Sequence, residues 1–171
     1  EVMGRHAGYL ALYVGIAVGA TAVLIPERDV DFEKDVVERI RESRLAGNTH
    51  FMIVVAEGAG SAVEIGKRIQ ETVGIDPRVT ALDTRVTVLG HIQRGGSPTA
   101  RDRETASRMG YAAVKALAEG RMNCIVGTNE GHLVEIPIEK ALNMTKPLQM
   151  ERYEVLEAMH NQVPLKCGPI Q

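Results

Sequence analysis

The sequence predicts an α/β fold, a three-layer and mostly parallel sheet covered by helices on both faces. Apolar runs rich in β-branched residues alternate four times with helical segments, and the connections between them are short. These runs are too uniformly apolar for a sheet that turns one face to water, which indicates parallel strands buried on both sides. With 171 residues, 44% of them apolar, the chain can bury such a core.

The first element is an uncharged run over residues 7–26, whose length of about 20 residues equals that of a membrane span. Three glycines interrupt it, and its second half, residues 21–25, is a β-branched stretch closed by Pro26. We therefore predict a buried helix of about 15 residues followed by a buried parallel strand. A membrane anchor over residues 7–25 is the alternative.

The middle of the chain continues the alternation. Asp31 is a suitable N-cap for a helix that ends at Gly47, and residues 50–56 form an apolar strand. A glycine turn follows this strand. Ser61 and Glu64 have the spacing of a capping box, which predicts a helix that ends at Gly74.

The last part of the chain carries one more strand and helix, a hairpin and two short helices. The turn chemistry of residues 128–131 indicates the hairpin. The predicted ranges are strand 85–90, helix 98–119, hairpin strands 123–127 and 132–136, and helices 137–142 and 151–160.

Composition excludes several partners. Twenty basic and 22 acidic residues give a net charge of −2, so no global field favours nucleic acid or an anionic membrane. Cys124 and Cys167 lack metal-ligand spacing and predict free thiols in a reducing cytoplasm. We expect no metal site in this chain.

The stretch 86–98 carries the strongest chemical signal. His91 and Arg94 follow an apolar run and precede the pair Gly95 and Gly96. Ser97 is suited to be the N-cap and Pro98 the first residue of a helix. Free amides, a helix dipole and a guanidinium favour an anion together, so this pattern predicts a phosphate site. The alternative is a surface turn with solvated side chains.

Further polar residues lie where ligands of parallel sheets gather, at the carboxyl ends of strands. Glu57 and His91 end predicted strands, and Arg5 precedes the first helix. Arg85 lies six residues before His91, about 20 Å away along a strand, so the two should not touch the same ligand. In a symmetric oligomer, Arg85 could contact the ligand site of a neighbouring subunit. The alternative is that Arg85 forms a salt bridge at the surface or at an interface.

Residues 1–8, 25–27 and 90–98, with Asp102 and Arg103, resemble the carboxyl-terminal half of a 6-phosphofructokinase. The resemblance covers nearly all of residues 1–160. It implies that Met3, Gly4 and Arg5 contact the sugar phosphate, with Arg5 also holding the phosphoryl group during transfer. By the same resemblance, Glu57 binds a fructose hydroxyl, His91 and Arg94 bind the 6-phosphate, and Arg85 reaches it from the adjoining subunit.

The implied activity is phosphoryl transfer in glycolysis from ATP with Mg²⁺, or from pyrophosphate, to the 1-hydroxyl of fructose 6-phosphate. The family's amino-terminal half, with its nucleotide loop, magnesium-binding aspartate and catalytic base, has no counterpart in this sequence. We therefore expect this polypeptide alone to bind sugar phosphate weakly, to be inactive, and to associate through exposed apolar surface. A non-catalytic sugar-phosphate-binding module that pairs with a separate chain is the alternative.

The resemblance also implies an allosteric homotetramer and a division into domains. Residues 1–93 would form most of a sugar-phosphate domain, 94–145 would belong to a nucleotide-binding domain, and 146–171 would be terminal helices and tail. Regulated bacterial relatives have an effector site with a lysine-rich turn and a glutamate. The corresponding positions in this chain are Gly-Asn-Thr-His at 47–50 and Thr21. Control by a nucleoside diphosphate or phosphoenolpyruvate is therefore not expected. The tripeptide His-Ala-Gly at 6–8 resembles the sequence found in the branch of the family that includes pyrophosphate-dependent members.

Overall fold

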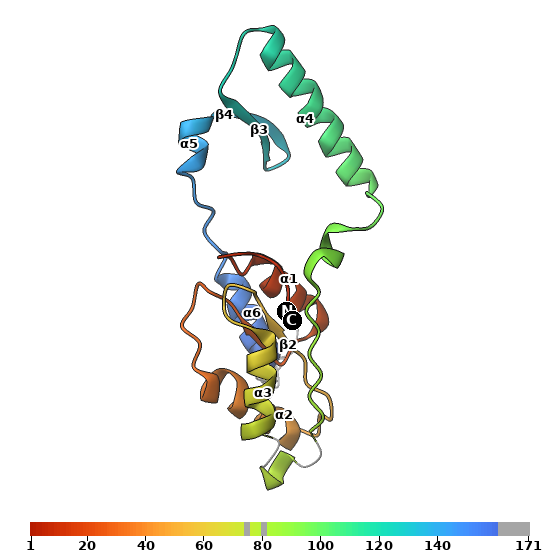
Figure 1. The fold of residues 1–171 in the computed structure, drawn as a ribbon, viewed down its shortest axis with the longest axis vertical. Coiled ribbons are helices and arrows are strands. Elements are labelled where there is room, and N and C mark those ends of the chain that lie inside the picture. The colour runs from red at the N-terminus through yellow and green to blue at the C-terminus, as the bar shows by residue number, and fades with distance from the viewer. Residues whose placement is uncertain (74–75, 80–81, 161–171) are drawn as a thin grey trace, which may run out of the picture. The chain divides into compact units, whose positions relative to one another are not determined.

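The computed structural model describes residues 1–73, 76–79 and 82–160, which belong to two compact units (Figure 1). Of the described residues, unit 1 comprises those within 1–94 and 148–160, and unit 2 comprises 95–147. Two predictions fall outside the described residues, the helix end at Gly74 and the free thiol of Cys167. Cys124 is a free thiol, as predicted.

Unit 1 is built on parallel pairing. Strand β1 (Ala22–Leu24) pairs in parallel with β2 (Ile53–Val55), and Val2 forms a parallel bridge with Ala56. On the other side of this first segment, the amino terminus donates to the carbonyl of Thr87 at 2.8 Å and the amide of Leu89 donates to the carbonyl of Glu1 at 3.2 Å. The parallel pairing therefore continues from β1 through β2 and residues 1–2 to residues 87–89.

The prediction of a regular strand over residues 85–90 is wrong. Residues 82–89 form neither a helix nor a strand. In the described chain Glu1 is their only backbone hydrogen-bond partner from a distant segment, the other bond being the local one from the Ile92 amide to the Leu89 carbonyl at 3.3 Å, and residues Gly90–Arg94 form the 3-10 helix η3. A single pairing residue cannot establish a ladder of hydrogen bonds. The predicted strand 50–56 is confirmed with narrower bounds.

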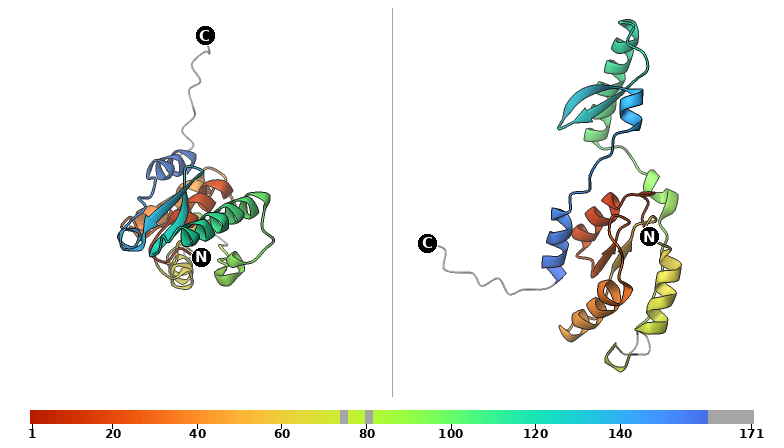
Figure 2. Two further views of the ribbon diagram at one scale, coloured as in Figure 1. Left: turned by 90° about the horizontal axis from the view of Figure 1, so that it is seen from above. Right: turned by 90° about the vertical axis from the view of Figure 1, so that its left-hand side faces the viewer.

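Three layers are present in unit 1, which confirms the predicted fold class. Helices α1 (Tyr9–Val18) and α6 (Glu151–His160) pack on one face of the sheet through Val23 and Val54. Leu24 and Val55 pack on the other face with residues of η1 (Glu33–Glu38), α2 (Arg39–Leu45) and α3 (Ala62–Thr72). Figure 2 shows how these helices are arranged around the strands. This alternation of side chains follows from the two-residue period of a strand.

Helix α1 is shorter and less buried than predicted. It has ten residues and ends at Gly19, whose φ of 61° lies in the left-handed region that glycine tolerates. Leu10 and Tyr13 are exposed, so only one face of the helix is in the core. Among the described residues no helix combines the length and the apolar character that a bilayer crossing requires.

Two helix starts differ in how far they follow the sequence prediction. Asp31 accepts from the amide of Lys34 at 3.3 Å and so caps the run of η1 and α2, as predicted, although its first part is a π-helix. The capping box of Ser61 and Glu64 is wrong. The amide of Ala62 donates instead to the side chain of Glu1 at 3.0 Å, because the chain start lies beside this helix end.

Unit 2 consists of α4 (Ala100–Ala118), the antiparallel hairpin of β3 (Cys124–Asn129) and β4 (His132–Pro137), and α5 (Ile138–Leu142). The predicted hairpin is confirmed, and its two turn residues, Glu130 and Gly131, both have positive φ. Helix α4 does not begin at Ser97 and Pro98. Its N-cap is Thr99, which forms a reciprocal capping box with Asp102.

Candidate functional site

An open pocket of about 350 Å³ lies where the chain leaves β2, and it is referred to below as the Arg5 pocket. Four segments line it: the loop after the first bridge, the start of α1, Glu57 two residues beyond the end of β2, and the end of η3. Its lining residues are Met3, Gly4, Arg5, Leu10, Glu57, Gln93 and Arg94. The structure thus brings together five of the seven site residues named from the sequence.

Glu57 organises the loop of the Arg5 pocket. Its Oε1 accepts hydrogen bonds from the backbone amides of Gly4, at 3.0 Å, and Arg5. These amide donors, the one on Arg5 foremost, hold the pKa of the Glu57 carboxyl below its usual range, and the charges of Arg5 and Arg94 act in the same direction. Within the described chain Oε2 has no hydrogen-bond partner, so it is available to a ligand donor.

Gln93 holds the same loop from the other side. Its Oε1 accepts from the amide of Met3 at 3.3 Å, and its Nε2 donates to the carbonyl of Gly90 at 3.2 Å. Its side chain therefore joins the loop to η3. Sequence reasoning missed Gln93, although it stands between His91 and Arg94 in the stretch singled out for phosphate binding.

The backbone around Arg5 is tightly constrained. Arg5 has a φ of 52°, which is uncommon for a residue with a side chain. A Cβ on Gly58 would lie 2.1 Å from the carbonyl oxygen of Arg5, so only glycine permits the approach of these two segments. The loop conformation that presents Arg5 thus depends on a residue that does not line the pocket.

The Arg5 pocket combines two guanidinium groups with one ionised carboxylate. Arg5 and Arg94 are exposed, and their side chains are not engaged in ion pairs within the described residues. Guanidinium groups are suited to bidentate contacts with phosphate, and a carboxylate accepts from hydroxyl groups. The arrangement can bind a small ligand that carries both a phosphate and hydroxyls.

Two of the predicted site residues lie outside this pocket. His91 is exposed on η3 and is not among the lining residues. Arg85 is exposed and forms an ion pair of 3.0 Å with Asp83, the surface salt bridge that the sequence left open as its alternative. A contact of Arg85 with a neighbouring subunit stays a prediction.

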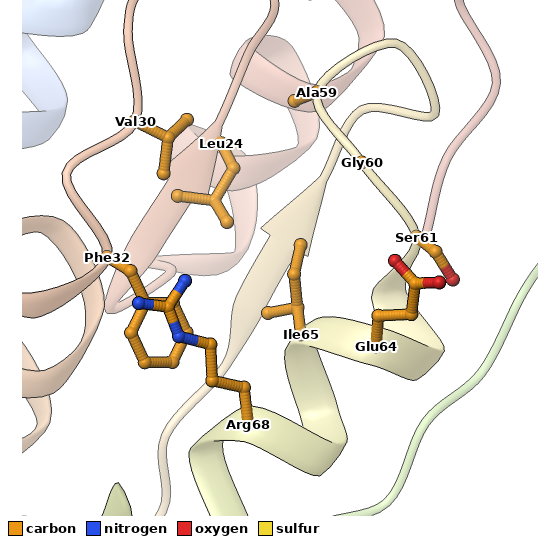
Figure 3. Close-up of a pocket in the computed structure, with 9 residues that line it drawn as sticks. All are labelled: Leu24, Val30, Phe32, Ala59, Gly60, Ser61, Glu64, Ile65 and Arg68. Carbon is orange, nitrogen blue, oxygen red and sulfur yellow. The ribbon is translucent and has the colours of Figure 1, made fainter.

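A second open pocket of about 350 Å³, the Arg68 pocket, lies between α3 and the segment after β1 (Figure 3). Leu24 and Ile65 form apolar walls, and Arg68 stacks on Phe32 with its Cζ atom 3.9 Å from the ring centroid. Sequence reasoning did not identify this pocket, because its residues come from three elements and form no motif.

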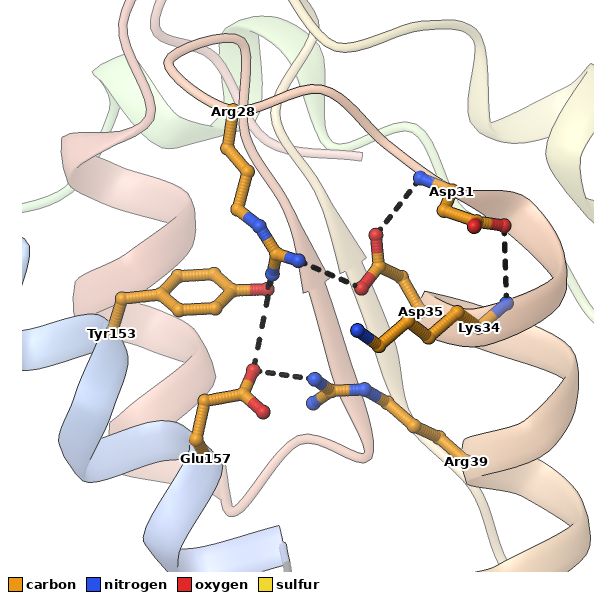
Figure 4. Close-up of polar contacts among 7 residues, drawn as sticks. All are labelled: Arg28, Asp31, Lys34, Asp35, Arg39, Tyr153 and Glu157. Carbon is orange, nitrogen blue, oxygen red and sulfur yellow. Dashed lines mark hydrogen bonds and ion pairs between the residues drawn. The ribbon is translucent and has the colours of Figure 1, made fainter.

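A partly buried cluster of charges joins α6 to η1 and α2 (Figure 4). Arg28 pairs with Asp35 at 3.0 Å and donates to the hydroxyl of Tyr153, and Arg39 pairs with Glu157. Burial raises the pKa of the Tyr153 hydroxyl, against the effect of the nearby Arg28. The two cations and two anions compensate one another, so the cluster fixes α6 on the core and leaves no net charge for a ligand.

Over residues 1–73, 76–79 and 82–160, no group of three or more His, Cys, Asp or Glu side chains is placed to hold a metal ion.

Comparison with known proteins gives a consistent result. Residues 1–117 match the family described as Phosphofructokinase. The ATP-dependent 6-phosphofructokinase of Bacillus cytotoxicus is 48% identical over 155 residues, which cover 91% of this chain and 46% of the relative. The chain therefore spans less than half the length of this curated relative.

Solved structures show the same fold. Phosphofructokinase from Saccharomyces cerevisiae is 34% identical with a TM-score of 0.70, over 94% of this chain and 21% of that one. The pyrophosphate-dependent phosphofructokinase from Marinobacter aquaeolei shares the fold with a TM-score of 0.67, at 24% identity over 88% of this chain and 41% of that one. Given the family match over residues 1–117 and this shared fold, the chain belongs to the phosphofructokinase family.

Proposed function

We propose that this chain supplies the sugar-phosphate-binding part of a 6-phosphofructokinase, which transfers a phosphoryl group to the 1-hydroxyl of fructose 6-phosphate in glycolysis. The observation that carries this proposal is the gathering of Arg5, Arg94 and Glu57 around one pocket. Unit 1 would be the sugar-phosphate domain and unit 2 would belong to the nucleotide-binding domain. The 48% identical relative is an ATP-dependent 6-phosphofructokinase, which supports ATP as the donor.

The residues in and beside the Arg5 pocket would have different roles in binding and in phosphoryl transfer. Arg94, with His91 from the same short helix, would bind the 6-phosphate. The free Oε2 of Glu57 would accept from a sugar hydroxyl while Oε1 holds the Gly4 and Arg5 amides. Arg5 would neutralise charge on the phosphoryl group in transfer, which is the main form of catalysis in this chemistry.

The proposal extends to assembly in the cytoplasm. Arg85 would reach the 6-phosphate of a neighbouring subunit in a homo-oligomer, as expected of a symmetric interface. Mg²⁺ that accompanies ATP would neutralise charge on the transferred phosphoryl group, and the described residues include no group of three or more His, Cys, Asp or Glu side chains placed to hold it. The 171 residues alone are therefore proposed to bind the sugar phosphate weakly and not to transfer a phosphoryl group.

Calorimetric titration of fructose 6-phosphate into this chain tests the binding proposal. Arg94→Ala should weaken binding at least about tenfold, because a charge-assisted contact with a phosphate is lost. Arg152→Ala removes an exposed guanidinium on α6 outside the pocket and should leave binding unchanged. Equal affinities of the Arg94 variant and the unaltered chain would refute the assignment.

Kinetics of the full-length gene product separate the two arginines. Arg94→Ala should raise the KM for fructose 6-phosphate, whereas Arg5→Ala should mainly lower kcat, since its contact strengthens in the transition state. Sugar-phosphate binding without turnover by the full-length product, with either donor, would favour the non-catalytic module instead.

A further inference from the structure

The Arg68 pocket separates two opposite charges that would be expected to pair. Glu64 and Arg68 are four residues apart on α3, with the acidic residue first, which is the favoured order for an ion pair on a helix. In the described residues they form no such pair. Arg68 lies against the ring of Phe32 instead, and Figure 3 shows Glu64 directed to the other side of the pocket, beside Ser61.

The space between these charges is apolar. Leu24, which is 2% exposed, lines the pocket together with Val30 and Ile65, all three with branched aliphatic side chains. The volume of about 350 Å³ is at the small end of the range of ligand sites, which is roughly 300–1,000 Å³. A small ligand with one apolar side chain and two opposite charges matches these walls.

The stacking of Arg68 prepares it for a planar anion. A guanidinium stacked on an aromatic ring does not use its N–H groups in that contact, so they can still donate hydrogen bonds to a carboxylate. The structure gives Arg68 no ion-pair partner among the described residues. At the opposite wall, Glu64 and the hydroxyl of Ser61 can accept hydrogen bonds from an ammonium group.

We propose that the Arg68 pocket binds a free α-amino acid with a branched aliphatic side chain. Its carboxylate pairs with Arg68, its ammonium with Glu64, and its side chain packs between Val30, Leu24 and Ile65. This assignment is independent of the proposed function, because the Arg68 pocket and the Arg5 pocket share no lining residue.

Titration of this chain with L-leucine, followed by amide NMR, tests the proposal. L-Leucine should shift the amide signals of residues 60–68 in a saturable way. The analogue 4-methylpentanoate lacks the ammonium and 3-methylbutylamine lacks the carboxylate, so each should bind at least about fivefold more weakly, because one charge-assisted contact is lost.

Variants test the same two contacts. Arg68→Gln and Glu64→Gln should each weaken L-leucine binding by a similar factor, and Lys67→Gln, which changes an exposed neighbour paired with Glu71 at 3.8 Å, should not. The amide spectrum of each variant shows whether it is folded. The proposal is overturned if L-leucine does not shift these signals, if either analogue binds as well, or if folded Arg68 and Glu64 variants bind like the unaltered chain.

Discussion

Gly58→Ala is the most informative single change, because it acts on the loop that presents Arg5. Gly58 is not in the left-handed region, so the backbone itself tolerates alanine. The obstacle is steric. The new Cβ would lie 2.1 Å from the carbonyl oxygen of Arg5 and 3.3 Å from the Cα of His6, whereas ordinary contacts begin at 3.4 Å.

The size of the effect follows from two opposing contributions. Overpacking against a well-packed neighbour costs about 1–3 kcal/mol, and here the neighbour is backbone, which cannot rotate away. Replacing glycine by alanine returns about 0.4–1 kcal/mol by restricting the unfolded chain. We therefore expect a net loss of about 1–2 kcal/mol, and a displacement of the Arg5 loop away from Glu57.

Urea unfolding followed by circular dichroism measures the loss, which should lower the midpoint by about 0.5–1 M for the usual denaturant slopes. Gly110→Ala is the matched control. Nothing lies within 4 Å of the Cβ it would add in α4, so it should stabilise the helix by up to about 1 kcal/mol. A Gly58→Ala chain as stable as the unaltered one, with the Arg5 amide still bonded to Glu57, would refute the steric argument.

Three further outcomes are expected. Leu156→Ala should cost about 2–5 kcal/mol in the same urea experiment, because Leu156 on α6 is fully buried, whereas Val155→Ala at a position 47% exposed should cost far less; similar losses would contradict the packing of α6 on the core. Thr99→Ala should cost about 1 kcal/mol of α4 stability, measured by hydrogen exchange, and Ser97→Ala should cost little, an order that reverses if Ser97 is the true cap. The pKa of Glu57, measured by NMR titration, should lie below the usual glutamate range. Its contribution to the free energy of unfolding is then complete above the pKa that Glu57 has in the unfolded chain, and it is lost as the pH falls through the lower pKa of the folded chain. A titration midpoint within or above the usual range would rule out the amide contacts.

The candidate site could be predicted in part. Arg5, Glu57 and Arg94 were named because parallel strands direct their carboxyl ends to one edge, and the motifs resemble a known family. Gln93 was missed because its role is a bridge between two segments about 90 residues apart, which no local pattern encodes. The Arg68 pocket was missed for the same reason, since stacking of Arg68 on Phe32 replaces the helical ion pair that its spacing suggests.

The sequence by itself determined the elements and their order, because hydrophobic period and turn chemistry act over a few residues. The α/β layering, the hairpin with Glu130 and Gly131 in its turn, and helix α6 followed from such local signals. Only the tertiary structure decided that Glu1 rather than a long ladder pairs with residues 87–89, and that Glu1 rather than Ser61 satisfies the start of α3. These contacts join residues far apart in the chain, and their partners are chosen by packing.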